Sequence, residues 1–457
     1  MAAIPGIPGL GLAQEPAPTP STTRTFDLQP LNTYAFEVSF SNRLAVRLAS
    51  GKAEKDGTEL ALNNTYHFSG VKSKILTLQG CKLEVEGPCI NEWVSRDASG
   101  TENGATVTVN AHLKLHEERR EAERKGIHGP RVLVVGPASS GKTTMVRSLA
   151  AYATRMGDQP LVVNLNPDEG MLTLPGTLSA AVFASMMDVE ARQGWGVAPA
   201  SGPGSIPPKV PIVHYFGRQT PEEDVGSYRD MVTAMADSVS ERLSGDESVR
   251  RSGLIIDTAP VGSGSKDSLA LLSHIISEFT VNVIITIDSK PLEGDLKDML
   301  RDERSSLGEQ IRVVDIPKAK SLPERDDLWL LQEREADVKE YFFGDAKMVL
   351  SPSTQLVDFD TLTIYKIPEI GTYPPGHTLE RVDPSPEMTH WTLAMMQASV
   401  KDAPETIRSS PALGFVYVAE VDAERSKVKL LAPLPGRLGD RPLIWGKWPE
   451  PNVNLLG

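Results

Sequence analysis

Cysteine is scarce in this sequence, which has only two, Cys81 and Cys89, among 457 residues. Neither has a His or Cys neighbour at the spacing of a metal site. Few cysteines in a long chain argue against a disulfide framework. Both are therefore predicted to be buried apolar residues of a protein kept in a reducing compartment.

Long hydrophobic runs are also missing. No segment reaches the ~18 apolar residues that a membrane-spanning helix needs. The first ten residues, MAAIPGIPGL, have neither the basic start nor the apolar core of a secretion signal. We therefore expect a protein of the cytosol or nucleus without a membrane segment.

Positive charge is in deficit, because 47 Lys and Arg face 60 Asp and Glu, for a formal net charge of −13. Such a balance argues against broad, nonspecific binding to nucleic acids, so any contact with RNA would need a local basic pocket. The chain is also longer than the roughly 250–300 residues that one core organises. More than one domain is expected.

The clearest motif is the stretch 131–144, RVLVVGPASSGKTT, in which an apolar strand meets G-x-x-x-x-G-K-[ST] and then a helix. The two glycines allow a turn that directs backbone N–H groups at phosphate oxygens. Lys142 is expected to reach the β and γ phosphates, and Thr143 to place its hydroxyl on Mg²⁺. The sequence therefore predicts a nucleotide-binding P-loop.

A P-loop site needs a second carboxylate for Mg²⁺ or its water shell, usually at the end of a neighbouring strand. Asp257 fits this role best and Asp288 is the rival, although either could merely cap a turn. A third strand end carries Asn166, followed by Asp168 and Glu169. An amide cannot accept a proton as a carboxylate can, so the site lacks its base if Asn166 faces the acceptor.

Basic residues between positions 301 and 325 flank a pattern predicted to be a helix and turn. They are Arg301, Arg304, Lys318, Lys320 and Arg325. Two interpretations stay open, a closing lid over transferred phosphate and a solvated charged face.

The apolar patterns divide the chain into four regions. We expect a disordered tail at 1–24, a β domain at 25–115, a P-loop ATP-binding domain with a parallel sheet at 116–345, and a small α/β domain at 346–457. The first domain should be antiparallel because its short alternating runs are separated by turn signals.

Within these regions the periodicity predicts individual elements. The strands expected in the β domain lie at 35–40, 44–48, 65–68, 75–78, 82–85 and 105–109, before a linker helix at 114–125. Parallel strands are expected at 160–165, 210–214, 254–256 and 281–287, helices at 224–243 and 267–279, and a surface insertion at 193–209. The last domain should contain strands at 362–367, 414–421 and 428–431 and a helix near 388–400.

Several stretches recur in the same order in one known family. They are GTEL at 57–60, GVKSK at 70–74, the P-loop stretch from 129, LPGT at 174–177, YFGRQTP at 215–221, EYFFG at 340–344, GFVYV at 414–418 and LLAPLPG at 430–436. The chain resembles the polynucleotide 5′-hydroxyl kinase family, in particular the branch with the fungal Clp subunit of pre-mRNA cleavage factor IA. Order and spacing over more than 350 residues carry the resemblance.

The resemblance implies an N-terminal β-sandwich, a central P-loop NTPase domain and a C-terminal α/β domain, with ATP and Mg²⁺ held between the first two. Thr33 and Lys72 would approach the adenine, and the segment 215–221 would clasp the 5′ end of an acceptor. Arg325 matches one lid arginine. The phosphates would be wrapped by Ser139, Ser140, Gly141, Lys142, Thr143 and Thr144.

The departures from active relatives fall on catalysis. Asn166 replaces the catalytic Asp, residues 257–262 replace a Trp-containing run, and Leu330 or Leu331 replaces a second lid arginine. The resemblance therefore favours a nuclear, ATP-bound adaptor of the pre-mRNA 3′-end cleavage and polyadenylation complex over an RNA 5′-hydroxyl kinase. An ATPase that drives a motion is a third alternative.

The partners implied for the adaptor come from the resemblance alone. They are the scaffold subunit of cleavage factor IA, which binds the C-terminal domain of RNA polymerase II, and other 3′-end processing subunits. A contact with RNA is possible on the same ground, and no membrane contact is expected.

Overall fold

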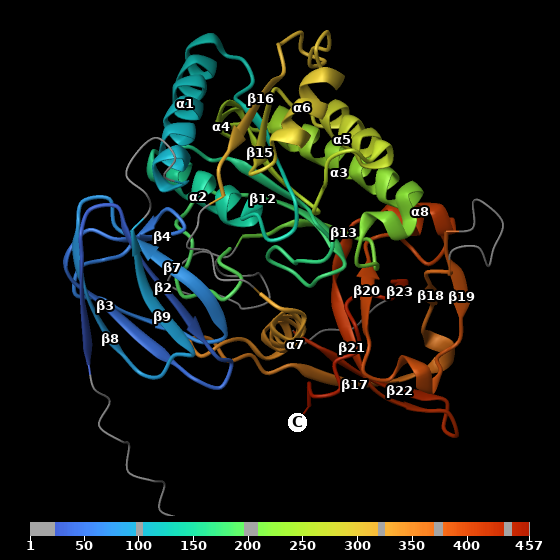
Figure 1. The fold of residues 1–457 in the computed structure, drawn as a ribbon. Helices are drawn as coiled ribbons and strands as arrows, with labels where there is room; N and C mark the ends of the chain where they lie inside the picture. Colours follow the sequence, from blue (N-terminus) through green and yellow to red (C-terminus); the bar gives the residue numbers. More distant parts are fainter. Residues whose placement is uncertain are drawn as a thin grey trace, which may run out of the picture.

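Three sheet-based units follow one another along the chain in the computed structural model (Figure 1). They are a β-sandwich, a P-loop unit with a largely parallel sheet and a C-terminal sheet, which confirms the predicted fold class. The domain boundaries stay predictions. The structure describes residues 23–96, 104–195, 209–318, 325–369, 378–433 and 441–456.

The sandwich packs two antiparallel sheets face to face, with orders β1-β8-β3-β6 and β5-β4-β7-β2-β9. The alternating pattern of each strand explains this packing. Along β8, for example, every second side chain, Cys81, Leu83 and Val85, points into the core between the sheets. Cys81 is buried as predicted, whereas Cys89 is only half-buried, and both are free. The strands are Arg24–Leu28, Asn32–Val38, Leu44–Gly51, Glu54–Lys55, Thr58–Glu59, Thr65–Phe68, Val71–Leu76, Cys81–Glu86 and Asn91–Arg96 for β1 to β9.

The strand predicted at 105–109 is wrong, since these residues lie in helix α1, Gly104–Lys125. Its β-branched residues resemble a strand locally. However, Val107, Ala111 and Leu115 recur every four residues and pack against the P-loop unit, which is helical spacing. Tertiary contact therefore decides the conformation here.

The central sheet has the order β13-β12-β11-β14-β10-β15-β16. Five strands are parallel, and β13, the strand predicted at 210–214, runs in their direction. It pairs antiparallel with β12, an unpredicted strand that runs the opposite way between β13 and β11. A parallel neighbour needs a long crossover, usually a helix, and the segment 166–176 that joins β11 to β12 contains none. The strands β10 to β16 are Arg131–Val135, Leu161–Leu165, Thr177–Val182, Ile212–Tyr215, Leu254–Thr258, Val283–Ile287 and Arg312–Ile316.

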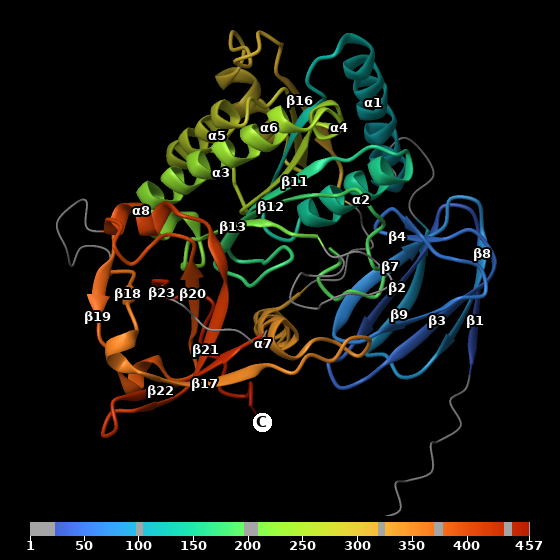
Figure 2. The ribbon, with the colours of Figure 1, turned by 180° about the vertical axis from the view of Figure 1, so that it is seen from behind.

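Helices cover both faces of this sheet, as Figures 1 and 2 show. Helix α2, Lys142–Arg155, packs with α1 on one face, while α3, Val225–Gly245, and α5, Lys266–Glu278, pack on the other. The helices predicted at 224–243 and 267–279 are thus confirmed. Two shorter helices, α4 and α6, span Glu247–Ser252 and Lys290–Met299.

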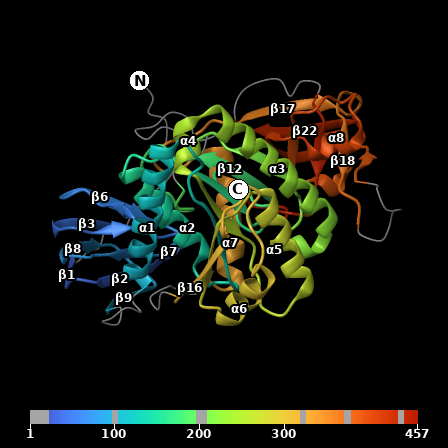
Figure 3. The same cartoon turned by 90° about the horizontal axis from the view of Figure 1, so that it is seen from above.

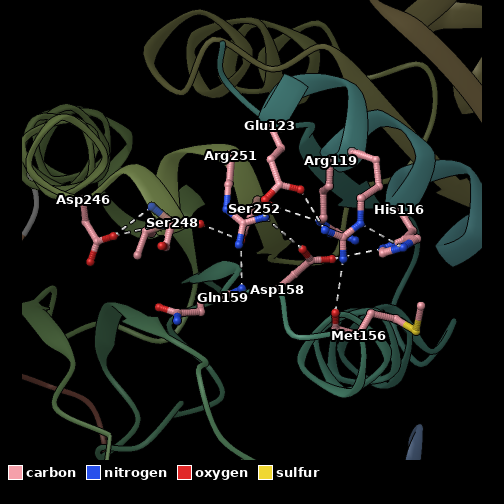
Figure 4. A network of polar contacts seen from close by, with 12 residues as sticks. His116, Arg119, Glu123, Met156, Asp158, Gln159, Asp246, Ser248, Arg251 and Ser252 are labelled. Atoms are coloured by element: carbon pink, nitrogen blue, oxygen red, sulfur yellow. Dashed lines mark hydrogen bonds and ion pairs between the residues drawn. The ribbon is translucent and has the colours of Figure 1, made fainter. Parts of the chain in front are cut away.

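A buried polar network ties the far end of α2 to α1 and α4 (Figure 4). The Asp158 carboxylate follows α2 and lies 3.2 Å from His116 Nδ1 of α1. Arg119 of α1 donates from Nε to the Ser252 carbonyl at 2.9 Å, and Arg251 pairs with Glu123 at 3.0 Å. Helix α2 is therefore fixed at both ends, at its N-terminus by the P-loop and at its C-terminus by contacts with α1.

The C-terminal sheet has the order β17-β22-β21-β20-β23-β18-β19. Helix α7, Asp327–Phe343, packs on it through Val338 and Phe342, and a short helix α8, Pro404–Ser409, flanks it. Strands β17 to β23 are Ser353–Asp358, Ile364–Lys366, Glu380–Val382, Thr392–Met396, Ala412–Asp422, Lys427–Ala432 and Leu443–Trp445.

The helix predicted near 388–400 is wrong. Its middle forms the central strand β20, flanked by β21 and β23. Leu, Ala and Met favour helices in isolation, but Leu393, Ala394 and Met396 are completely buried between neighbouring elements. Most of the insertion predicted at 193–209, and all but two residues of the tail at 1–24, lie outside the described residues.

Arg408 joins the C-terminal unit to the central sheet. Its buried guanidinium donates to the carbonyls of Tyr215 and Phe216, at 2.5 and 2.8 Å, where β13 ends. Burial lowers its pKa to about 10, so it stays charged near neutral pH. Two buried carbonyls thus depend on one side chain.

We expect Arg408→Ala to lower the free energy of unfolding by about 2–4 kcal/mol, because both carbonyls lose their partner in a dry environment. Urea unfolding followed by fluorescence would measure the change. Arg425→Ala is the matched control, since that side chain is 80% exposed and should have no measurable effect. An equal loss in both variants would contradict the assignment.

Candidate functional site

The P-loop motif forms the strand, turn and helix that it predicts. Strand β10 ends at Val135, and α2 begins at Lys142. The backbone needs glycine at Gly141, whose φ is 96°, and at Gly136, where a Cβ would meet the Ile287 carbonyl oxygen at 3.1 Å. The loop therefore turns tightly enough to present its N–H groups at the start of a helix.

Lys142 lies buried above this loop. Its Nζ donates to the carbonyls of Gly136 and Pro137 at 3.2 and 3.0 Å. Burial lowers its pKa, while Asp257 and Glu169 act in the opposite direction. The ammonium group is thus held where anions of a ligand would be its natural partners.

A cavity of about 230 Å³ opens beside the loop, between the sandwich, the P-loop unit and α7. All six predicted loop residues, from Ser139 to Thr144, line it. It is rich in both charges. The cations are Lys55, Lys72, Lys142, Arg147, Arg192, Arg325 and Arg334, and the carboxylates are Asp56, Asp168, Glu169, Glu333 and Asp337.

A smaller hollow of about 80 Å³ lies on the other side of the loop. Thr33 and Lys74 of the sandwich line it, together with apolar side chains such as Leu76, Met145 and Ile316. Lys72 lies instead in the larger cavity, with Nζ 4.8 Å from the centre of the Trp329 ring. Thr33 thus lines the smaller hollow and Lys72 the larger cavity, and the two spaces adjoin, since Asp56, Ser140, Gly141 and Thr144 line both.

The structure separates the two candidate metal carboxylates. Asp257 lies at the end of β14 opposite Val134 of β10, next to the P-loop. Burial raises its pKa to about 6 despite a hydrogen bond from Thr143, and its Oδ1 finds no hydrogen-bond partner among the described residues. Neither carboxylate lines the two cavities directly, but Asp257 is buried beside the P-loop strand whereas Asp288 is exposed. The geometry therefore favours Asp257.

Asn166 lines the larger cavity where the sequence placed a missing base. Its side-chain oxygen accepts from the Asp168 N–H at 3.3 Å. Asp168 lines the same cavity and accepts from Gln219 Nε2 at 3.1 Å, and burial raises its pKa. A carboxylate thus stands two residues from the predicted position. The sequence showed Asp168 near the end of this strand, but it could not show that its side chain faces the cavity.

Of the basic residues predicted as a lid, Arg325 does line the cavity. It pairs with Glu169 at 2.8 Å and Glu333 at 3.1 Å, and the charge of Glu169 raises its pKa. Arg301 and Arg304 are exposed at the surface and line neither cavity, so the lid interpretation is wrong for them.

The pattern between these arginines also differs from the prediction, because residues Arg312–Ile316 form the edge strand β16 of the central sheet rather than a helix and turn. Their alternation of exposed and half-buried residues is typical of an edge strand. Lys318 lines neither cavity, and Lys320 lies outside the described residues.

Helix α7 supplies cavity residues that sequence reasoning missed. Leu330, which with Leu331 was a candidate for the missing lid arginine that the resemblance implies, lines the cavity, and Arg334, one turn later, lines it too. Its guanidinium pairs with Glu450 at 2.7 Å and lies 4.5 Å from the centre of the Trp448 ring. Residues four apart on a helix share a face, so the position of Arg334 relative to Leu330 could have suggested that both line the cavity. Its partners, over 100 residues away, were not predictable.

The segment 215–221, expected to clasp an acceptor, is placed differently. Tyr215 is buried in the C-terminal core against Phe415 and donates to the Trp448 carbonyl at 3.0 Å, so its predicted role is wrong. Gln219 is the residue of this segment that contacts a cavity side chain, through Asp168. The segment therefore supports the cavity wall more than it lines the cavity.

Among the described residues no cluster of three or more His, Cys, Asp or Glu side chains is arranged to hold a metal ion. Within the described ranges, no helix is long and apolar enough to cross a membrane.

Three family models match successive parts of the chain. Residues 27–122 match the N-terminal β-sandwich domain of polyadenylation factor. Residues 136–344 match the P-loop of the mRNA cleavage and polyadenylation factor CLP1, and residues 350–450 match the pre-mRNA cleavage complex II protein Clp1. The matches fall on the three units of the fold in order.

Full-length relatives give the same result. The chain is 49% identical to the mRNA cleavage and polyadenylation factor CLP1 of Pyricularia oryzae and 44% identical to that of Botryotinia fuckeliana. Each alignment covers 99% of this chain and 100% of the relative.

Solved structures also match. A structure of wild-type Clp1p in complex with Pcf11p superposes with a TM-score of 0.85 at 28% identity, over 93% of this chain and 98% of that one. A second, with a TM-score of 0.84, describes an extended interface between Pcf11p and Clp1p and the basis of ATP loss in a point mutant. The chain belongs to the mRNA cleavage and polyadenylation factor CLP1 family.

Proposed function

We propose that the protein is an ATP-holding adaptor subunit of the nuclear pre-mRNA 3′-end cleavage and polyadenylation complex, in fungi cleavage factor IA. The observation that carries the proposal is the charged cavity whose walls come from the sandwich, the P-loop unit and α7 together. A nucleotide bound there would fix the arrangement of all three. The relatives named as cleavage and polyadenylation factors supply the biological setting.

The cavity suits a nucleoside triphosphate. Backbone N–H groups of Ser139 to Thr144 and the Lys142 ammonium would hold the phosphates. Lys72 faces this larger cavity and would act on the phosphates rather than on the base. Thr33 and the apolar walls of the smaller hollow would meet the adenine.

Mg²⁺ would be held by Thr143 and Asp257, directly or through water. The Oδ1 atom of Asp257 is buried and has no partner among the described residues, a position that a hydrated cation would satisfy. Mg²⁺ would link the phosphates to the end of β14 and neutralise part of their charge.

The pKa of Asp257 generates a test of this role. A folded-state pKa of about 6, against an ordinary 3.8, means that the fold loses stability progressively as the pH rises from about 4 to 6, with the full loss above pH 6. Asp257→Asn should therefore raise the stability of nucleotide-free protein at pH 8 by roughly 1–3 kcal/mol. The gain should shrink as the pH falls from 6 to 4, where the wild-type group is protonated in both states.

The same Asp257→Asn variant should bind ATP in Mg²⁺ roughly 10- to 100-fold more weakly, because an amide is a poorer partner for hydrated Mg²⁺. Binding with EDTA present should change little. Calorimetry with and without Mg²⁺ measures both. Asp288→Asn is the matched control and should change neither quantity. An unchanged Mg²⁺ dependence in Asp257→Asn would remove this residue from the site.

The adaptor role rests on the amide of Asn166 at the base position, which cannot accept a proton from an attacking hydroxyl. Loss of a general base typically costs ~10²- to 10⁴-fold in rate. Two observations favour RNA 5′-hydroxyl kinase activity as the second candidate. Asp168 offers a carboxylate of raised pKa in the cavity, and Arg334 offers a second cation.

We expect wild-type protein to transfer no label from γ-labelled ATP to a 5′-hydroxyl RNA. Asn166→Asp alone should not create transfer. Gel analysis of the RNA against an active polynucleotide kinase gives the readout. Transfer by wild type that disappears in Asp168→Asn, while ATP is still bound, would establish the kinase and displace the adaptor.

The adaptor mechanism predicts that an empty site weakens partner binding. Lys142→Ala with Thr143→Ala should prevent ATP retention and lower the unfolding temperature, since a ligand at a hundredfold excess over Kd contributes ~2.7 kcal/mol. Affinity for the scaffold subunit, the counterpart of Pcf11p in the related complex, should fall at the same time.

Scanning fluorimetry and a titration of the scaffold fragment measure these two effects. Lys297→Ala, on the exposed surface of α6, is the control and should retain ATP and scaffold affinity. An emptied protein of lower unfolding temperature that still binds the scaffold as tightly as wild type would contradict the mechanism.

A further inference from the structure

A second open hollow lies at one end of the C-terminal sheet, where β18, β20 and β23 have neighbouring ends. Its volume is about 450 Å³, within the range of sites for small ligands. Two tryptophans and two lysines line it, namely Trp391, Trp445, Lys366 and Lys447. None of these residues lines the nucleotide cavity.

The sheet places these side chains together. Lys366 and Trp445 are register partners of the parallel pair β18 and β23, and Trp391 immediately precedes β20, which runs antiparallel to β23. The two indole rings meet edge to face, with centres 5.9 Å apart, and Lys366 Nζ lies 4.7 Å from the centre of the Trp445 ring. The strands therefore hold an aromatic wall beside a cation.

One polar group of this wall has no partner. The Nε1 atom of Trp445 is buried without a hydrogen-bond partner among the described residues. Most buried indole N–H groups do find one. Trp391, in contrast, is only half-buried, so part of its ring is accessible at the hollow. The hollow thus offers the accessible part of an aromatic ring to a ligand.

Charge at the hollow is mixed. Lys447 is exposed and pairs with Glu369 at 2.7 Å, and Glu387 also lines the wall. A ligand recognised by charge alone would find little net attraction. A ligand that contains both a planar ring and a negative charge fits better, because the two indole rings and the side chains of Lys366 and Lys447 line the same hollow.

We propose that this hollow binds single-stranded RNA, with one base stacked on Trp391 and adjacent phosphates near Lys366 and Lys447. Aromatic side chains among cations are the usual platform for unpaired bases, and stacking tolerates any sequence. The inference rests on the proposed role in pre-mRNA processing, which supplies unpaired RNA. A proline-rich peptide would also suit tryptophans, but it gives no role to the two lysines.

The hollow adjoins the nucleotide cavity through one short segment of chain. The Lys447 N–H donates to the Gly217 carbonyl at 2.8 Å, and Gln219, two residues further on, contacts Asp168. Trp448, next to Lys447, carries Arg334 of the nucleotide cavity over its ring. RNA at the hollow would therefore lie beside a segment that contacts side chains of the nucleotide cavity.

The test uses full-length protein and a 12-nucleotide uridine RNA with a 3′ fluorophore, followed by anisotropy. Trp391→Ala should weaken binding by roughly 10-fold or more, whereas Trp391→Phe, which keeps a stacking ring, should stay within about threefold of wild type. With about two phosphate contacts, log Kd should rise with log salt at a slope near 1.4, and Lys366→Ala with Lys447→Ala should abolish most of that slope.

Matched controls are Trp93→Ala in the sandwich and Lys427→Ala, whose ammonium pairs with Asp358 elsewhere in the C-terminal sheet. Both should bind RNA as wild type does. Equal RNA affinity in Trp391→Ala and wild type would overturn the site.

Each variant is also assayed for ATP retention and scaffold binding, so that the two proposals can fail separately. Absence of RNA binding by wild type that retains ATP and scaffold would overturn the RNA site and leave the adaptor standing. Binding of a polyproline peptide in place of RNA, lost in Trp391→Ala, would likewise overturn it.

Discussion

The nucleotide site depends on one contact, in which the tight turn at Asp56 and Gly57 of the sandwich packs against helix α2. At Gly57, φ is 80° and a Cβ would come within 2.9 Å of the Ser148 carbonyl oxygen, so only glycine allows this approach. Asp56 pairs with Arg147 of α2 at 3.3 Å. Although burial alone would raise its pKa, Arg147 and Lys55 lower it. The Asp56 carboxylate therefore stays ionised and holds the turn against the P-loop helix through its ion pair with Arg147.

Helix α7 completes the arrangement from the other side. In all three ribbon views it lies between the sandwich and the C-terminal sheet (Figures 1 to 3). Its Trp329 packs on Phe40 of the sandwich, with ring centres 5.0 Å apart, while Phe342 enters the C-terminal core. Since α7 also carries Arg334 into the cavity, a change in the bound ligand would be felt by all three units.

The same charges that suit a ligand compete with one another inside the protein. Arg325 pairs with Glu169, and Arg192 pairs with Asp337 at 3.0 Å, across a cavity that also holds Lys142. Buried ion pairs are costly unless every partner is satisfied. A bound polyphosphate would reorganise these pairs, which is a physical reason for the proposed adaptor to keep its nucleotide.

The sequence by itself determined the P-loop, the fold class and most core strands, because glycine spacing and hydrophobic periodicity are local properties. Only the tertiary structure decided which of the two candidate carboxylates lies buried beside the P-loop, since Asp257 and Asp288 both lie at the ends of buried strands. It also decided that β12 reverses direction beside β11, that residues 392–396 form a strand, and that Asp168 and Arg334 lie in one cavity. These features depend on contacts between segments far apart in the chain, whose direction no local pattern encodes.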